Sequence, residues 1–466
     1  MEKNDVQKKL FSEINNKKLF QRSLGNSLDY VEEVFERTVF PSKQAISNLD
    51  SFNEALPDNG LPGESIIETL NKYGSPATVA QLGGRYFGFV NGSAVPAGIA
   101  AKLMATFWDQ NTALNIISPI SGKLEAVVEQ WLNELFGFDN KCVSGFVTGT
   151  SAANFCGISA ARYRILSNLG WDVNEKGLRN APAIRIVAGK HAHSSVIKAV
   201  NMNGLGQECI EWVDTDLQGR IEHEKMPPLD NSCIVLLQAG NVNSGAFDNF
   251  NAVCKVANEA GAWVHIDGAF GLWAQCSSTL KKWTNGIHLA DSWAVDGHKT
   301  LNTPYDCGII ICKHQNALRS AMHMSGSYIM KNETRDGMYH TGDMSRRSRI
   351  IELWATIKSL GKKGIDELVT NMHLRALQFA SLLTEANGFE VLNEIDFNQI
   401  IVCCKTDDLT EKVMRFIQDD GTCWVGHSKW NNKRVIRISI CSWATTKNDV
   451  ALSFHAFKRA LQKATT

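Results

Sequence analysis

Short apolar runs rich in β-branched residues recur through the middle of the chain, and amphipathic stretches lie between them. The runs occupy residues 145–147, 184–187, 233–237, 263–266, 293–295 and 308–312. Apolar positions spaced three and four apart predict helices at 153–166 and 252–260. This alternation of strands and helices predicts an α/β fold, with a mostly parallel sheet between layers of helices.

The two ends of the chain follow other patterns. The N-terminal residues show amphipathic helical spacing, and such helices cannot bury their apolar faces alone. Towards the C-terminus a long helix is expected, followed by strands at 400–404 and 435–441 and a final helix at 449–463. We therefore predict a helical N-terminal segment that packs on a partner subunit, a large domain and a small α+β domain, over 1–80, 81–350 and 351–466.

The charge balance narrows the classes of function. The 466 residues hold 48 Lys and Arg against 48 Asp and Glu, so the formal net charge is zero. A protein that binds nucleic acid or a membrane surface through bulk charge is basic, and we therefore expect neither partner. No apolar run approaches the length of a membrane span, and the charged N-terminus lacks the apolar stretch of a secretory signal.

Twelve cysteines are scattered along the chain, several of them inside apolar runs. Their spacing is typical neither of a disulfide framework nor of a metal site. We interpret them as reduced, mostly buried thiols, and we predict a cytoplasmic protein without a bound metal.

Polar residues follow the predicted strands, at the sheet edge where ligands bind in α/β folds. A turn of small and hydroxyl-bearing residues, 148–154, precedes a helix, and its Thr150 and Ser151 suit a phosphate group at the helix N-terminus. The alternative is simple capping of the helix, a role that Ser and Thr have in many proteins.

Asp267 ends the strand expected at 263–266. A buried carboxylate needs a partner, and a protonated pyridine nitrogen, a metal and an arginine are all suitable. Gly268 and Ala269 are small and leave room for a flat ring. The alternative is an aspartate that caps the next turn.

Lys299 follows His298 just after the strand expected at 293–295. Lysine forms Schiff bases with carbonyl cofactors, although a lysine in an exposed loop is the commoner case. A phosphate turn, a carboxylate and a lysine at strand ends, in this chain order, describe a site for pyridoxal 5′-phosphate. His193 follows another predicted strand and suits a position flat on the cofactor ring, whereas the ring of His191 is expected to point to a different face.

Taken together, these motifs resemble the group II pyridoxal-phosphate-dependent amino-acid decarboxylases, which include the aromatic-amino-acid, glutamate and histidine decarboxylases. The matching segments are Arg85-Tyr86-Phe87-Gly88, 148–154, Ala192-His193-Ser194-Ser195, 238–248, 265–271, 296–308 and Ser345-Arg346-Arg347. The resemblance implies fold type I, the aspartate-aminotransferase fold, with a large domain built on a seven-stranded sheet and a smaller C-terminal domain.

The resemblance also implies an activity, the removal of carbon dioxide from an L-amino acid to give the amine. Lys299 would hold pyridoxal 5′-phosphate as a Schiff base (the internal aldimine), and Asp267 would pair with the pyridine N–H. Ala269 and His193 would contact opposite faces of the ring. The cofactor-binding residues implied in this way are Thr150, Ser151, His193, Asn243, Asp267, Ala269, His298 and Lys299.

A proton must return to the α-carbon after carbon dioxide leaves, and relatives use a Tyr on a mobile loop ahead of the Arg-Arg pair. Tyr339 is the natural candidate in this chain, and His340 is the alternative. In the family the partner subunit completes the site. We therefore expect a homodimer in which the loop at 330–345 reaches across.

Other outcomes stay open with the same cofactor. Without the loop donor, oxygen can convert the carbanion to an aldehyde, and transamination or retro-aldol cleavage are further outcomes on this fold. Arg437 lies in a predicted strand of the small domain and suits either a substrate carboxylate, as in aminotransferases, or a structural salt bridge. A non-catalytic pseudoenzyme would be expected to have lost cofactor-binding residues such as Lys299, Asp267 and His193, all of which are present. The identity of the amino acid is left open.

Overall fold

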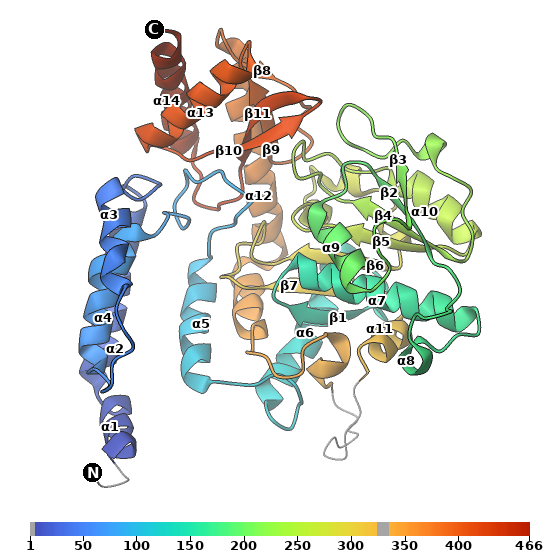
Figure 1. The fold of residues 1–466 in the computed structure, drawn as a ribbon, viewed down its shortest axis with the longest axis horizontal. Coiled ribbons are helices and arrows are strands. Elements are labelled where there is room, and N and C mark those ends of the chain that lie inside the picture. The colour runs from blue at the N-terminus through green and yellow to red at the C-terminus, as the bar shows by residue number, and fades with distance from the viewer. Residues whose placement is uncertain (1–4, 324–334) are drawn as a thin grey trace.

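A seven-stranded sheet forms the centre of the protein in the computed structural model, which describes residues 5–323 and 335–466 (Figure 1). Its strands are β1 (Val143–Val147), β2 (Arg185–Gly189), β3 (Ile210–Val213), β4 (Cys233–Gln238), β5 (Trp263–Asp267), β6 (Ser292–Asp296) and β7 (Gly308–Cys312). The spatial order is β1-β7-β6-β5-β4-β2-β3. Strands β2 to β6 run parallel, whereas β7 is antiparallel to both β1 and β6. The predicted mostly parallel sheet is confirmed, and the run at 308–312 is strand β7 as expected; strand β3 and the antiparallel direction of β7 were not predicted.

Helices cover both faces of this sheet, because alternate residues of its strands enter two different cores. In β6, Trp293 and Val295 belong to one core and Ala294 to the other. The helices of the large domain include α6 (Pro119–Phe136), α7 (Thr150–Asn168), α8 (Val173–Lys176), α9 (Ser194–Met202), α10 (Phe250–Glu259) and α11 (Gln315–Ala321). Helices α7, α9 and α11 pack on the face that carries Ala294, and α6 and α10 pack on the opposite face.

A second, four-stranded sheet organises the C-terminal part. Its elements are β8 (Glu390–Val391), β9 (Gln399–Cys403), β10 (Gly426–Trp430) and β11 (Lys433–Ser439), with α12 (Ile350–Glu385), α13 (Asp407–Asp420) and α14 (Lys447–Thr465). The strands are antiparallel in the order β10-β11-β9-β8. Helix α12 joins the two parts and is interrupted at Gly361, whose φ is 61°. The predicted β9, β11 and α14 are confirmed, whereas β8 is too short and β10 too polar to show in the apolar pattern.

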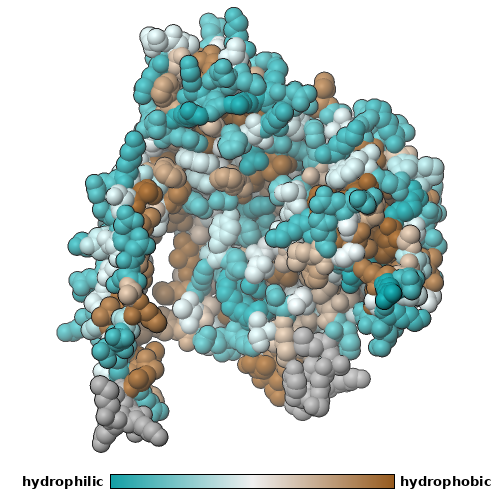
Figure 2. All heavy atoms as spheres, viewed as in Figure 1, coloured by the Kyte–Doolittle hydropathy of each residue, from teal (hydrophilic) through white to brown (hydrophobic). Residues whose placement is uncertain are grey.

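The N-terminal helices form an arm beside the body of the molecule (Figure 1). The arm contains α1 (Asp5–Ile14), α2 (Lys17–Val34), α3 (Lys43–Ser47) and α4 (Gly63–Thr69), and α5 (Pro96–Trp108) follows it and packs on α12. Apolar side chains stay exposed on the arm (Figure 2). Leu10 and Phe11, for example, are 58% and 62% exposed. None of the helices in the described parts of the chain is long and apolar enough to cross a membrane.

Candidate active site

A cavity of about 340 Å³ lies where the carboxyl ends of β4, β5 and β6 meet the small domain. The large domain contributes His193, Asp267, Ala269 and Lys299 to its lining, and the small domain contributes His427 and Arg437. The structure therefore brings together four of the residues that the sequence assigned to one site. This position agrees with the rule that ligands of α/β sheets bind beyond the strand ends.

Asp267 forms the floor of the cavity and is only 6% exposed. Its Oδ1 accepts the backbone N–H of Ala269 at 3.1 Å, and its Oδ2 accepts the amide N–H of Asn154 at 3.2 Å. The carboxylate is thus satisfied on both oxygens by donors, and no cation among the described residues pairs with it. A buried anion in this state suits a cationic group of a ligand such as a pyridinium N–H.

Lys299 contacts a carboxylate that the sequence analysis overlooked. The Lys299 Nζ lies 3.1 Å from Oδ2 of Asp296, three residues earlier at the end of β6. The other oxygen of Asp296 accepts the backbone N–H of Thr150 at 2.7 Å. Asp296 therefore ties the lysine to the first turn of α7. The same rule that singled out Asp267, an acid at the end of a buried strand, could have found it.

His193 is held in one orientation by the start of α9. It is the N-cap residue of that helix, and its Nδ1 accepts the backbone N–H of Ser195 at 3.2 Å. Burial lowers the pKa of His193, an effect that Asp267 opposes and Lys299 reinforces. The ring is therefore neutral near pH 7 and carries its proton on Nε2. His191 lies elsewhere, with its ring centroid 4.8 Å from that of Trp430.

The expected phosphate turn lies at the N-terminus of α7, beside His298. Thr150 is buried, and its Oγ1 has no hydrogen-bond partner within the described part of the chain, whereas Ser151 is exposed. The Nδ1 of His298 accepts the backbone N–H of Cys307 at 3.1 Å, and its ring stacks on Tyr305 at 4.2 Å. Burial lowers the pKa of His298. An unpaired buried hydroxyl at a helix N-terminus fits a phosphate group.

Asn243 does not line the cavity, and its assignment stays a prediction. Its Oδ1 accepts a hydrogen bond from Ser428 of β10 at 2.7 Å. Gln238, at the end of β4 in the same sequence motif, lines the cavity instead. Gln238 resembles Asp267 in the sequence, because each is a polar residue at the end of a buried strand.

The segment that holds Tyr339 and His340 lies against the edge strand β1 and helix α11, and neither residue lines the cavity of its own subunit. His340 is 4% exposed, and its Nδ1 donates to the backbone oxygen of Asp336 at 3.2 Å. Burial holds the pKa of His340 well below its usual range, with Arg335 adding to the effect. Tyr339 is partly exposed under the guanidinium of Arg319, 5.6 Å away. The first residues of the expected loop, 330–334, lie outside the described residues.

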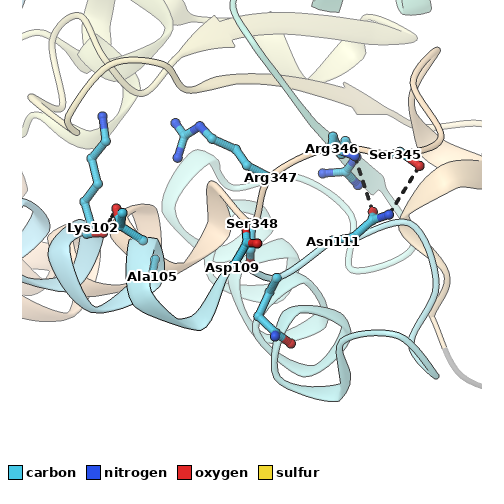
Figure 3. Close-up of a pocket in the computed structure, with 10 residues that line it drawn as sticks. Lys102, Ala105, Asp109, Asn111, Ser345, Arg346, Arg347 and Ser348 are labelled. Atoms are coloured by element: carbon cyan, nitrogen blue, oxygen red, sulfur yellow. Dashed lines mark hydrogen bonds between the residues drawn. The ribbon is translucent and has the colours of Figure 1, made fainter. Parts of the chain in front are cut away.

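The Ser345-Arg346-Arg347 motif anchors this segment. Arg346 pairs with the buried Glu125 at 3.0 Å and donates to the backbone oxygen of Phe146. Arg347 points in another direction and pairs with Asp306 (Figure 3). Both arginines border a separate polar cavity of about 580 Å³ next to α5, where Asn111 bonds to Ser345 and to the Arg346 backbone (Figure 3).

Phe89 and Val90 form another wall of the active-site cavity, and their backbone is in an unfavourable conformation. Their φ values are positive, 52° and 58°, which are rare for bulky and β-branched residues. Phe89 stacks on Trp424, which in turn stacks on Tyr86. Such backbone strain is concentrated at functional sites. Neither lining residue was predicted from the sequence, although both directly follow the Arg85-Tyr86-Phe87-Gly88 motif.

Arg437 is a largely buried cation without a counter-ion. It lies on β11, lines the cavity and donates to the backbone oxygen of Val242 at 3.2 Å. Its Nε has no hydrogen-bond partner, and no carboxylate in the described ranges pairs with it. Burial lowers the pKa of Arg437. Of the two roles that the sequence left open for Arg437, the structural salt bridge is therefore not formed.

Comparison with known proteins agrees with this geometry. The profile of the family described as "Pyridoxal-dependent decarboxylase conserved domain" matches residues 47–406. An aromatic-L-amino-acid decarboxylase of Bacillus atrophaeus is 24% identical, over 88% of this chain and 89% of its own. The acidic amino acid decarboxylase GADL1 of Xenopus tropicalis is 26% identical, over 73% and 68%. The structure of Oryza sativa TDC with PLP and tryptamine superposes with a TM-score of 0.87 at 19% identity, over 96% of this chain and 99% of that one.

The fold and the cavity define a fold-type I enzyme that uses pyridoxal 5′-phosphate. The chain belongs to the pyridoxal-dependent decarboxylase family. It is a carboxy-lyase that converts an amino acid to an amine and carbon dioxide. The residues present fit the cofactor, since the cavity offers an amine, a hydrogen-bonded carboxylate and a neutral imidazole, and the adjoining α7 turn offers a hydroxyl without a partner among the described residues.

Proposed function

We propose that this enzyme decarboxylates an L-amino acid whose α-carboxylate binds to Arg437. The observation that carries the proposal is the cavity itself, where a largely buried arginine, paired with no carboxylate among the described residues, lines the same space as Lys299. A buried cation is costly until an anion pairs with it, so the free energy of binding a carboxylate is concentrated at this point. The amino group of such a substrate is then directed toward Lys299.

Each residue of the floor has a role in this proposal. Lys299 would hold pyridoxal 5′-phosphate covalently, and Asp267 would accept a hydrogen bond from the pyridine N–H. His193 and Ala269 enclose the ring, and Thr150 donates its free hydroxyl to the phosphate. When bound, the cofactor supplies the electron sink for the electron pair that departing carbon dioxide leaves behind. The protein contributes orientation, because the bond that breaks must stand perpendicular to the ring.

Proton return is assigned to Tyr339 of a second copy of the chain. Neither Tyr339 nor His340 lines the cavity of its own subunit, so a donor from this segment must act on the neighbouring subunit's cavity. Tyr339 is preferred because His340 is buried and already bonded to Asp336. If this donor fails to reach the α-carbon, oxygen becomes the competing electron acceptor. Oxidative decarboxylation to an aldehyde is therefore the second candidate function.

A homodimer is part of the proposal. Helix α5 exposes apolar side chains along its length, and Leu103, Met104 and Phe107 are 46%, 53% and 56% exposed. The arm adds further exposed apolar residues and touches α5 through Phe20 and Phe107, whose ring centroids are 5.2 Å apart. Exposed apolar surface of this extent is typical of a subunit interface, and a second copy of the chain is the proposed occupant.

A cytoplasmic location is the remaining element of the proposal. All twelve cysteines belong to the described residues and are free, and ten of them are buried. Thiols in this state are typical of a reducing compartment.

Product analysis tests the proposal. Holoenzyme incubated with the common amino acids, together with acidic and diamino variants, is expected to yield one new amine by mass spectrometry. Lys299→Ala is expected to reduce the yield to background, whereas Lys313→Ala, at an exposed lysine after β7, retains it. A keto acid, or an aldehyde with peroxide, would replace the proposed reaction by transamination or by oxidative decarboxylation. Absence of both product and cofactor absorbance in the wild type would refute the proposal.

A further inference from the structure

A chain of buried polar side chains runs behind the cavity floor, between α7 and the sheet. Trp263, His265 and Asp267 are alternate residues of β5, so their side chains share one face of the strand. Ser292 of β6 lies directly opposite His265 in the strand register, and Asn154 approaches from α7. His265, Ser292 and Asn154 are 0% exposed, and Trp263 is 4% exposed. The sheet register and one helix thus assemble the chain.

Four consecutive hydrogen bonds connect these side chains. The Trp263 Nε1 donates to Ser292 Oγ at 3.0 Å, and Ser292 Oγ lies 2.8 Å from His265 Nδ1. The His265 Nε2 lies 2.9 Å from Asn154 Oδ1. The Asn154 Nδ2 donates to Asp267 Oδ2 at 3.2 Å. Each of the four side chains before Asp267 therefore has its polar atoms satisfied inside the protein.

The chemistry of its two ends fixes the direction of the chain. An indole N–H only donates, and a carboxylate only accepts. Because the Asn154 amide group faces Asp267, its oxygen is left to accept from His265 Nε2. A neutral imidazole has one N–H, so His265 Nδ1 must accept, and the Ser292 hydroxyl must donate to it. All four donors consequently point toward Asp267.

His265 has the protonation state that this direction requires. Burial lowers the pKa of His265 to about 3, so the ring is neutral at any pH where the enzyme operates. Gly157 of α7 also packs closely on the ring, since a Cβ at that position would lie 2.5 Å from His265 Cε1. A side chain at that position of α7 would push the ring out of line with Asn154. The glycine is therefore a requirement of the chain.

We propose that Trp263, Ser292, His265 and Asn154 are positioning residues that act through Asp267, stabilising its ionised form and so the protonated state of the cofactor's pyridine nitrogen. The inference rests on the proposed role of Asp267 and adds four residues to it. Hydrogen bonds in a row polarise one another, so a donor two or three bonds away still strengthens the last bond. Outer partners of this kind change activity although they never touch a ligand.

The nitrogen-15 chemical shift of the pyridine ring reports this effect directly, because protonated and neutral pyridine nitrogens differ in shift. The experiment uses holoenzyme loaded with nitrogen-15-labelled pyridoxal 5′-phosphate. The variants are Ser292→Ala and Trp263→Phe, which remove one link each. Trp293→Phe is the matched control, because Trp293 is also buried beside β5 but donates to the Ile287 backbone oxygen at 2.9 Å, outside the chain. Asp267→Asn removes the end of the chain.

The expected shifts toward the neutral value decrease in the order Asp267→Asn, Ser292→Ala, Trp263→Phe, with none in Trp293→Phe. We also expect kcat to fall about ten-fold in Ser292→Ala. If Asp267→Asn moves the shift while both Ser292→Ala and Trp263→Phe keep the wild-type value, the chain is structural only and this inference fails. If Asp267→Asn leaves the shift unchanged, the role of Asp267 in the proposed function fails instead. Should Ser292→Ala not fold, Trp263→Phe against Trp293→Phe decides.

Discussion

Two charged residues in the same cavity are in opposite states. Asp267, on the floor, has donors on both oxygens, and a chain of buried side chains stands behind it. Arg437, on the side of the small domain, is largely buried, with one bond to a backbone oxygen and an Nε that has no partner in the described part of the chain. Both lie in surroundings where an unpaired charge is costly. The protein thus stabilises one charge fully and leaves the other without a counter-ion.

The difference indicates which ligand each residue serves. A resident cofactor needs a floor whose charge state does not change between turnovers, and a satisfied, rigid carboxylate provides that. A substrate must enter and leave, so its binding site gains affinity from a group whose partner is absent until the substrate arrives. Asp267 belongs to the central sheet and Arg437 to the small domain. The large domain therefore holds the permanently bound cofactor, and the small domain supplies the group for the substrate that is exchanged at each turnover.

The largest effect is expected from Arg437→Gln, which removes the uncompensated charge. A charge-assisted hydrogen bond contributes about 1.5–3 kcal/mol, so KM should rise roughly ten- to hundred-fold. Because Arg437 pairs with a carboxylate that loses its charge as carbon dioxide forms, the contact stabilises mainly the bound substrate, and kcat should fall much less than KM rises. Steady-state kinetics on the substrate found by product analysis checks this, with Arg437→Lys expected to recover part of the loss.

Substrate comparison distinguishes the two carboxylates that Arg437 can bind. If the α-carboxylate is bound, the rise in KM is the same for amino acids with aromatic and with acidic side chains. A rise confined to acidic substrates would show that Arg437 binds the side-chain carboxylate, and an unchanged KM for all substrates would contradict its role altogether.

The next effect concerns the product. Tyr339→Phe is expected to leave carbon dioxide release largely intact while the aldehyde becomes the main product, because the carbanion then reacts with oxygen instead of a proton donor. Oxygen consumption and peroxide formation measure the change. His340→Gln serves as the comparison, since His340 is buried and bonded to Asp336. Tyr328, outside the described residues, offers a second control, and a product change in Tyr328→Phe alone would move the assignment away from Tyr339.

The floor could be predicted from the sequence to a much greater extent than the rest of the cavity. Lys299, Asp267 and His193 each follow an apolar run, and parallel strands bring their carboxyl ends to one edge. The local pattern of strand followed by polar residue is therefore enough to predict that these three residues, far apart in the sequence, lie close together. The same logic would have found Gln238 and Asp296, which also end buried strands.

The other walls depend on packing that no local pattern reveals. Phe89 and Val90 reach the cavity through a strained loop, and Arg437 arrives from a strand of the other domain. Sequence placed Arg437 in a strand but left a salt bridge and a carboxylate site equally open. Whether Arg437 has a counter-ion depends on which side chains the tertiary fold places around it, and the local sequence does not show this. The donor chain behind Asp267 likewise depends on strand register, which pairs His265 with Ser292.

A smaller effect is expected on the pH dependence of stability, and it tests whether His265, behind the cavity floor, is excluded from protonation. The pKa of His265 is about 3 in the folded protein, against an ordinary value of 6.5. Between these values the unfolded chain binds a proton that the folded protein excludes, so stability falls as pH drops from about 6.5 toward 3 and is constant above that range. One proton corresponds to about 1.4 kcal/mol per pH unit. Urea unfolding of the apoprotein should show this slope in the difference between wild type and His265→Gln.

The comparison isolates His265 because other titrations cancel in the difference. Asp248 is one of them, since burial raises its pKa to about 6 and its contribution has the opposite sign. Equal pH slopes in the wild type and His265→Gln would mean that the ring takes up a proton in the folded state. The direction assigned to the hydrogen-bond chain would then be wrong.

The smallest effect is expected at Thr150, on the α7 turn beside the cavity, which resembles Arg437 in that a buried polar atom has no partner among the described residues. Thr150→Val should leave the apoprotein as stable as before or slightly more stable, because an unsatisfied hydroxyl is removed. The Kd for pyridoxal 5′-phosphate should nevertheless rise about two- to ten-fold, the value of one neutral hydrogen bond. Thr356→Val is the matched control, since the buried hydroxyl of Thr356 already donates to the backbone oxygen of Glu352 at 2.8 Å. That variant should lose stability and keep its cofactor affinity, the reverse of Thr150→Val. If both variants lose stability alike and neither weakens cofactor binding, the orphaned hydroxyl is not a phosphate ligand, and the contrast with Asp267 rests on Arg437 alone.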